Sequence, residues 1–332
     1  MNHPLISVIM PARNAAAFLP QCIESIQSQT YTDWELIAID DHSTDDSYQV
    51  IEAYAQKDAR IQVYRNDGKG IIDALSLAYM RSSGQLITRM DADDYMAPDK
   101  LKLMSAALIQ SGEGHISIGY VKYFSDVQLG NGYLNYATWL NDLTMMGSNF
   151  SEIYKECSIP SPCWMVHRND LDHCGAFESN IYPEDYDLAF RFRKQGLEII
   201  PVTEILHHWR DHESRASRND DNYKDNLFAK LKVPHFIDQD YNQERQLVLW
   251  GAGRKGKQIA KLLHEEGVPF LWICDNPNKI GQIIYDMQLH DQSILRQRRH
   301  LQVIVAISSV QGRHEIKDLI REFGQHEYYR FC

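Results

Sequence analysis

At 332 residues the chain is long enough for about two domains, and its 44% hydrophobic and 24% charged residues are typical of a globular protein rather than a disordered or fibrous one. The net charge of −11 at pH 7 argues against a general nucleic-acid-binding protein, because no broad basic field would meet the phosphates. The six cysteines form no Cys-x-x-Cys pair, so we expect reduced thiols rather than a zinc site or a disulfide framework.

The first half of the chain alternates short apolar runs with amphipathic segments. Four apolar, β-rich runs predict buried parallel strands, at residues 5–10, 34–39, 61–64 and 86–88. Between them we expect helices, the first capped by Asn14 and the second capped by Ser43 or Thr44. This alternation predicts an α/β fold with a doubly wound, mostly parallel sheet.

Acidic residues follow two of these runs. Asp40 and Asp41 end the second run, and Asp91, Asp93 and Asp94 follow the fourth. In doubly wound sheets ligands bind at the carboxyl ends of the strands, where the strand order reverses. Three carboxylates that repel one another favour a divalent cation such as Mg²⁺ or Mn²⁺, which would hold a diphosphate. The acids of the second run are suited to accept hydrogen bonds from a nucleobase or a ribose. An acidic turn before the next helix is the alternative.

Four stretches of the chain resemble glycosyltransferase family 2. They are residues 7–14, 28–36, 40–45 and 90–94, the last together with residues 98–101. The resemblance covers about residues 4–215 and implies the nucleotide-sugar transferase A fold with a metal-dependent, inverting activity. It also implies a nucleoside-diphosphate-sugar donor, expected to be a UDP-sugar, and a glycan or lipid-linked acceptor in bacterial surface polysaccharide synthesis.

The resemblance also assigns donor-site residues. Asp93 would bind the metal and Asp91 would meet the ribose side. The uracil pocket would be lined by Pro11, Ala12 and Asp41. Further donor contacts are expected from Arg13, Asn14, Lys69, Ala92 and Arg210. Two departures from the family pattern are His42, where the family often has glycine, and the absence of an Arg-Asn pair after Gly70. Lys69 would supply a phosphate contact instead, or is a solvated loop lysine.

A second acidic cluster follows Pro183, where we expect a helix to begin. An inverting transfer needs a carboxylate that takes the proton from the acceptor hydroxyl. The Glu-Asp pair of the family maps onto Glu184 and Asp185. The resemblance implies that Asp185 is the base and that Glu184 accepts a supporting hydrogen bond, either from the acceptor substrate or from the surroundings of the base. Asp187 should face elsewhere. The alternative is a helix-start acid cluster without a catalytic role.

A strand is predicted at residues 198–202, and the segment 210–214 then resembles the closing segment of the family. We expect a lid in which Arg210 meets the diphosphate and His212 binds the metal or a phosphate. A surface histidine is the alternative reading of His212.

Residues 1–215 are therefore predicted to form the catalytic domain and residues 216–244 a linker. Its lysines, Lys224, Lys230 and Lys232, suggest peripheral attachment to a membrane. No segment approaches the about 18 apolar residues of a membrane span, and no signal peptide is evident. We expect a cytoplasmic protein, at most peripheral at the inner face of the membrane.

Residues 245–332 are predicted to form a small Rossmann-like domain. A strand at residues 246–250 leads directly into Gly251, Gly253 and Gly256, which open a helix, and the next strand ends at Asp275, near the offset of a ribose-binding acid. Further elements are a strand at residues 303–307 and a helix from about Gly312 to Phe323.

The domain resembles nucleotide-binding-like modules appended to some sugar-modifying enzymes. If it binds a ligand, NAD or a nucleotide-sugar would contact the three glycines and Asp275. A scaffold or homo-oligomer role is the alternative, and an NAD-dependent oxidoreductase or a nucleotide sensor acting through this domain is the competing function.

Overall fold

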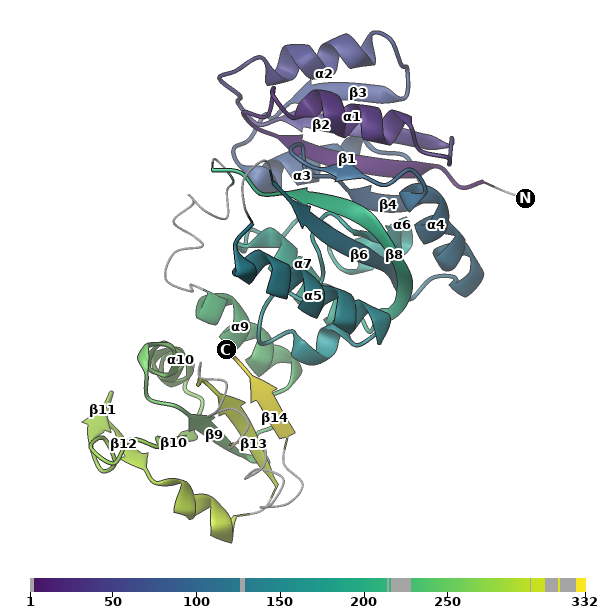
Figure 1. Ribbon diagram of the computed structural model, residues 1–332. Helices are drawn as coiled ribbons and strands as arrows, with labels where there is room; N and C mark the ends of the chain where they lie inside the picture. Colours follow the sequence, from purple (N-terminus) through teal and green to yellow (C-terminus); the bar gives the residue numbers. More distant parts are fainter. Residues whose placement is uncertain are drawn as a thin grey trace. The chain divides into compact units, whose positions relative to one another are not determined.

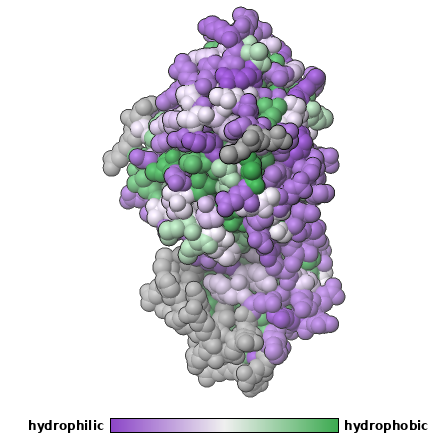
Figure 2. Space-filling view, turned by 90° about the vertical axis from the view of Figure 1, so that its right-hand side faces the viewer, coloured by the Kyte–Doolittle hydropathy of each residue, from purple (hydrophilic) through white to green (hydrophobic). Residues whose placement is uncertain are grey.

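The structure is a computed structural model and describes residues 3–125, 129–213, 215, 228–298, 300–307, 316 and 327–332. The chain divides into two compact units, one of residues 1–151 and 157–219 and the other of residues 152–156 and 220–332. Within the described ranges no helix has both the length and the apolar character needed to cross a membrane. The face drawn in Figure 2 is mostly hydrophilic, with hydrophobic residues gathered in one area at mid-height.

The first unit is built on an eight-stranded sheet (Figure 1). Its strands are β1 (Ile6–Ala12), β2 (Trp34–Asp40), β3 (Ile61–Arg65), β4 (Leu86–Arg89), β5 (Tyr95–Met96), β6 (His115–Phe124), β7 (Trp164–His167) and β8 (Glu198–Arg210). The order across the sheet is β3-β2-β1-β4-β7-β6-β8-β5, with β7 antiparallel to both of its neighbours. Because β1 pairs in parallel with β2 on one side and β4 on the other, the strand order reverses at β1. The predicted doubly wound, mostly parallel sheet is confirmed.

Helices accompany the sheet along the chain. They are α1 (Leu19–Gln27), α2 (Ser47–Ala55), α3 (Ile71–Arg81), α4 (Lys100–Ser111), α5 (Asn131–Met145), α6 (Arg168–His173) and α7 (Glu184–Lys194), with a 3₁₀ turn at Asn149–Glu152. Alternate residues of β1, such as Val8 and Met10, join one buried cluster with Leu19 and Ile23 of α1. Each such side chain contributes about 1.5–3 kcal/mol on burial. This packing fixes the carboxyl ends of β1, β2 and β4 beside one another.

Two local predictions for this unit are wrong at the start of its helices. Asn14 does not cap α1: its backbone has φ 51°, and its Oδ1 accepts hydrogen bonds from the backbone N–H and the hydroxyl of Thr44. Neither Ser43 nor Thr44 caps α2, which begins at Ser47, and Asp45 accepts the Ser47 N–H instead. The physical reason is that the loops after β1 and β2 bind each other.

The strand predicted at residues 198–202 is also longer than expected. β8 continues to Arg210, so Arg210 belongs to the sheet rather than to a lid. The register against β6 shifts after the pair Gly119 and Val202, and pairing resumes at Ile205. This bulge absorbs two exposed polar residues, Thr203 and Glu204, which interrupt the apolar pattern.

The second unit carries a six-stranded sheet in the order β11-β12-β10-β9-β13-β14, parallel except for the pair β11 and β12. Its elements are α9 (Phe228–Gln239), β9 (Gln246–Trp250), α10 (Arg254–Glu265), β10 (Phe270–Ile273), β11 (Ile283–Ile284), β12 (Met287–His290), a 3₁₀ helix at Gln292–Gln297, β13 (Leu301–Val305) and β14 (Glu327–Arg330). This is the predicted small α/β sheet. The helix predicted from Gly312 to Phe323 lies outside the described residues, apart from Ile316.

One of the lysines predicted to reach a membrane, Lys232, does not face solvent. Lys232 is only 5% exposed, and its ammonium group donates to the carbonyl of Lys155 at 2.9 Å. Lys230 is exposed, and Lys224 lies outside the described residues. A basic membrane-docking face that includes Lys232 is therefore excluded.

Candidate functional site

The segments after β2 and β4 lie on either side of the end of β1. The Asp41 N–H donates to the carbonyl of Ala12 at 2.8 Å, and the Met90 N–H donates to the carbonyl of Ile9 at 3.0 Å. The predicted donor residues from Pro11 to Asn14 therefore lie between Asp41 and the segment Asp91–Asp93. This is the position where the strand order reverses and where such sheets bind ligands.

Asp41 is buried and organises the loop after β3. Its Oδ1 accepts hydrogen bonds from the side-chain amide of Asn66 at 2.8 Å and from the Gly70 N–H at 3.0 Å. Its Oδ2 faces the guanidinium of Arg13 at 3.9 Å. The side chain of Lys69 is exposed, and its backbone N–H donates to Asp73. One oxygen of Asp41 thus shapes the loop, and the other lies on the side of Arg13.

His42 adopts the left-handed backbone conformation for which the family often uses glycine, with φ 56°. Its Nε2 lies 2.8 Å from the carbonyl oxygen of Gly68, at hydrogen-bond distance. Histidine is among the residues that adopt this conformation more readily than most. The substitution is therefore compatible with the fold and adds a tie between the loops after β2 and β3.

Asp40, which the sequence placed with Asp41 at the ligand-binding strand end, is buried away from the surface. It is 1% exposed, and neither carboxylate oxygen has a hydrogen-bond partner among the described residues. Its Oδ2 lies 3.8 Å from the guanidinium of Arg65. A buried carboxylate without hydrogen bonds is unfavourable, and the guanidinium of Arg65 offsets part of that cost. The signal for this burial in the sequence was its place as the last residue of a buried strand.

Arg89 joins the two acidic motifs. Its Nε donates to Asp91 Oδ1 at 2.9 Å, and its NH1 group donates to Glu184 Oε1 at 2.8 Å. Arg89 and Glu184 are 5% and 6% exposed, so the pair is shielded from water and its hydrogen bonds are charge-assisted. The motifs are 95 residues apart in sequence, and this guanidinium brings them into one site. Sequence reasoning gave Arg89 no role.

Asp185 follows Glu184 in the first turn of α7 and is partly buried. Burial and, next, the charge of Glu184 raise the pKa of Asp185 to about 7, against the opposing charge of Arg89. A carboxyl group with a pKa near neutrality suits proton transfer. Asp187, by contrast, is fully buried and accepts a hydrogen bond from Arg191 at 2.8 Å, which holds one turn of the helix together.

The side chains predicted to bind a metal lie side by side. His212 Nε2 is 2.9 Å from Asp93 Oδ2, and Arg210 Nε donates to the backbone carbonyl of Asp93 at 2.8 Å. The ring of Phe18 lies 4.6 Å from the ring of His212 and 5.0 Å from the guanidinium of Arg210. Ser214, the last residue of the predicted lid, lies outside the described residues.

The prediction that three carboxylates face one cation is wrong for Asp94, which points into the protein. Asp94 is 2% exposed, its Oδ2 lies 2.9 Å from His207 Nε2, and its Oδ1 accepts the Arg210 N–H at 2.7 Å. Burial lowers the pKa of His207, so the neutral ring can donate to this carboxylate. Asp94 thereby fastens β8 to the loop after β4. Among the described residues, no three His, Cys, Asp or Glu side chains are grouped so that they could hold an ion.

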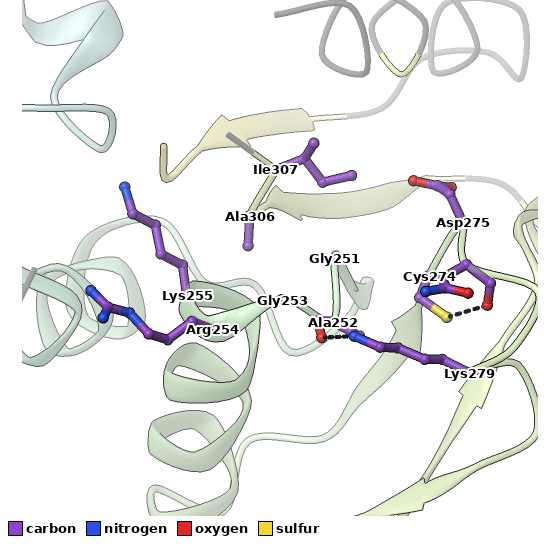
Figure 3. A pocket seen from close by; sticks show the side chains of 11 residues that line it. Gly251, Ala252, Gly253, Arg254, Lys255, Cys274, Asp275, Lys279, Ala306 and Ile307 are labelled. Carbon is purple, nitrogen blue, oxygen red and sulfur yellow. Dashed lines mark hydrogen bonds between the residues drawn. The ribbon is translucent and has the colours of Figure 1, made fainter. Parts of the chain in front are cut away.

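In the second unit the predicted ligand residues lie at the carboxyl end of β9. Gly251, Gly253 and Asp275 all line one cavity (Figure 3). Gly256 is buried beneath, in the first turn of α10. The carboxylate of Asp275 accepts a hydrogen bond from Trp250 Nε1 at 2.8 Å.

The comparisons with known proteins agree with this architecture. Residues 7–175 match the family model described as Glycosyl transferase family 2. An uncharacterized glycosyltransferase of Haemophilus influenzae is 37% identical over 130 residues, which is 39% of this chain and 51% of the relative. The chain thus spans about half the length of that curated relative.

Two solved structures share the fold. S. aureus TarS 1–349 in complex with UDP-GlcNAc superposes with a TM-score of 0.56 and 15% identity, covering 78% of this chain and 71% of that one. The mannosyltransferase PcManGT from Pyrobaculum calidifontis, in complex with GDP-Man and Mn2+, gives a TM-score of 0.52 and 18% identity, covering 72% and 64%. At these identities the likeness concerns the fold.

Proposed function

The chain belongs to glycosyl transferase family 2, and on that premise we propose that it transfers a sugar from a nucleoside-diphosphate sugar to an acceptor hydroxyl with inversion at the anomeric carbon. The observation that carries the proposal is the Arg89 bridge, which ties Asp91 to Glu184 and so sets Asp185 beside the acidic strand end. A donor-binding acid and a base are then parts of one preorganised site.

In this proposal Asp185 accepts the proton of the acceptor hydroxyl while that oxygen attacks the anomeric carbon. The bond from the anomeric carbon to the diphosphate breaks on the opposite face, so no covalent intermediate with the protein forms. Glu184 is held by Arg89 through Oε1, and in this proposal its role is to position the first turn of α7. Of the two roles that the sequence suggested for Glu184, contact with the acceptor substrate or with the surroundings of the base, this is the second.

The donor nucleoside would lie over the end of β1. Asp41 would accept hydrogen bonds from the nucleobase or the ribose, and Arg13 and Asn14 would lie beside it. Asp91, whose Oδ1 is bound to Arg89, would meet the ribose through its second oxygen. The shared fold of S. aureus TarS in complex with UDP-GlcNAc supports a UDP-sugar as donor. A glycan or lipid-linked acceptor, in bacterial surface polysaccharide synthesis, completes the proposal.

Asp93 and His212 fit a divalent metal such as Mn²⁺. A carboxylate oxygen and an imidazole nitrogen 2.9 Å apart are suitable neighbouring ligands, and such ions commonly take their remaining ligands from water and substrate phosphates. When bound, the metal would neutralise charge on the leaving diphosphate. Arg210, tied to the Asp93 carbonyl, would add a positive charge beside it.

Calorimetric titration of the full chain tests the proposal directly. We expect UDP to bind with Mn²⁺ present and to lose affinity with chelator or in an Asp93→Ala variant. GDP and the UDP-sugars are titrated in parallel to identify the base and sugar. UDP binding that is unaffected by both the chelator and the variant would contradict the metal assignment, and the absence of binding by any nucleotide would contradict the donor site.

A further inference from the structure

The second unit contains a cavity of about 520 Å³ that the proposed transfer does not use. It opens at the carboxyl ends of β9, β10 and β13, and Gly251, Cys274 and Ala306 line it from those three strand ends (Figure 3). Because β9 lies between β10 and β13, the cavity is at the point where the strand order of this sheet reverses. Its volume is within the range of small-molecule sites, and its place is where such sheets bind ligands.

The three glycines of the loop differ in what they do. Gly251 has φ 124°, and a Cβ there would lie 2.7 Å from the carbonyl oxygen of Ala306. A Cβ on Gly256 would lie 2.0 Å from the carbonyl oxygen of Gly251. These two glycines are therefore required by the close packing of the loop, the sheet and α10. Gly253 is different: it is exposed, and a Cβ there would meet no atom within 4 Å. The packing of the fold does not require glycine at this position. Because Gly253 has no side chain, the backbone of this cavity-lining residue is not covered.

The cavity carries positive charge on two sides. Arg254 and Lys255 extend from the first turn of α10, and Lys279 reaches in from the opposite side, where its ammonium group donates to the carbonyl of Ala252 at 3.0 Å (Figure 3). The first turn of α10 contains no acidic residue of its own to oppose the positive end of the helix. The acid that lines the cavity, Asp275, is bound to the Trp250 indole. This arrangement favours an anion.

We propose that this cavity binds the diphosphate of a nucleotide. The loop 251–254 and the start of α10 would hold the phosphates through backbone N–H groups, with Lys279 as a charged partner. Cys274 and Ile307 offer apolar surface beside that position for the nucleoside. The diphosphate could belong to NAD or to a nucleotide-sugar, since both present the same charged group to the loop.

Titrations on the full chain with an Asp93→Ala background test this site apart from the donor site. With chelator present, NAD⁺, ADP, UDP-GlcNAc and inorganic phosphate are titrated separately, so that failure of the transferase proposal does not affect the result. We expect NAD⁺ or a nucleotide to bind more tightly than inorganic phosphate. Gly253→Val should weaken binding roughly tenfold or more, because the new side chain covers the loop backbone. Lys279→Ala should weaken it by a similar factor, because a charge-assisted contact is lost.

The matched control is Lys261→Ala, because Lys261 is an exposed lysine of α10 that pairs with Glu265 outside the cavity lining. This variant should bind as the parent does, and Lys279→Arg should restore most of the affinity. Thermal unfolding of every variant verifies the fold. Binding of none of the nucleotides, binding of inorganic phosphate alone, or equal affinity in the parent and in both cavity variants would overturn the proposal.

Discussion

The two units each have a strand-end site at the point where the strand order reverses, but they build it from different parts of the chain. The first site is made of side chains, in which Arg89 gathers acids from two motifs. The second is made of backbone, with glycines at the positions where a side chain would collide or would cover the loop. A side-chain site loses function when a group is removed, whereas a backbone site fails when an atom is added.

Removing one carboxylate should have the largest effect. We expect Asp185→Asn to lower the rate of sugar transfer about 10²–10⁴-fold, because the amide cannot accept the acceptor proton. Donor affinity should stay within a factor of about two, since the Arg89 contacts are unchanged. The measurement is single-turnover transfer together with calorimetric donor binding. As a control, Glu198→Gln alters a carboxylate that is 83% exposed and should have no effect. Transfer at the wild-type rate in Asp185→Asn would remove Asp185 from the mechanism.

Adding one carbon atom should disrupt the second unit. Gly256→Ala places a Cβ 2.0 Å from the Gly251 carbonyl oxygen, and the backbone must move to admit it. We expect a loss of about 1–3 kcal/mol in the unfolding free energy of this unit. Gly253→Ala, which meets nothing within 4 Å, is the control and should unfold like the wild type. Urea unfolding followed by tryptophan fluorescence measures both, and equal midpoints for the two variants would show that the loop is not packed as described.

The pH dependence of transfer sharpens the contrast, because the first site depends on a titrating group. Burial and Glu184 raise the pKa of Asp185 to about 7, so transfer should fall about tenfold for each pH unit below that value, as the base becomes protonated. The charge of Arg89 holds this pKa down, so Arg89→Gln should move the acid limb of kcat/KM to higher pH, while Arg89→Lys should move it less. An acid limb that is the same in all three proteins would separate Arg89 from the base.

The sequence was sufficient for much of the fold but not for the connections inside the site. Strand burial and loop packing leave local sequence patterns. For this reason the sequence predicted β1 to β4 from their apolar runs and the loop after β9 from its glycines. The role of Arg89 was not predicted, since its partner Glu184 is 95 residues away and no local pattern records that pair. Asp94 was predicted to be a third metal ligand, but β8 buries it through His207. The predicted strand ended too early because the polar bulge in β8 interrupts the apolar pattern.

The smallest expected effect is on the unfolding free energy, which the raised pKa of the catalytic base Asp185 lowers at neutral and alkaline pH. The carboxyl of Asp185 has an ordinary pKa of 3.8 when unfolded and about 7 when folded, so between these values the folded chain keeps a proton that the unfolded chain has lost. Stability therefore falls as pH rises from about 4 to 7, and Asp185→Asn removes that loss. In chelator and without donor, we expect the variant to be about 1 kcal/mol more stable at pH 8, roughly 2–4 °C in Tm, with little difference at pH 4. A variant that is less stable than the wild type at pH 8 would contradict this. It would mean that the ionised carboxylate of Asp185 has partners that stabilise it in the folded chain.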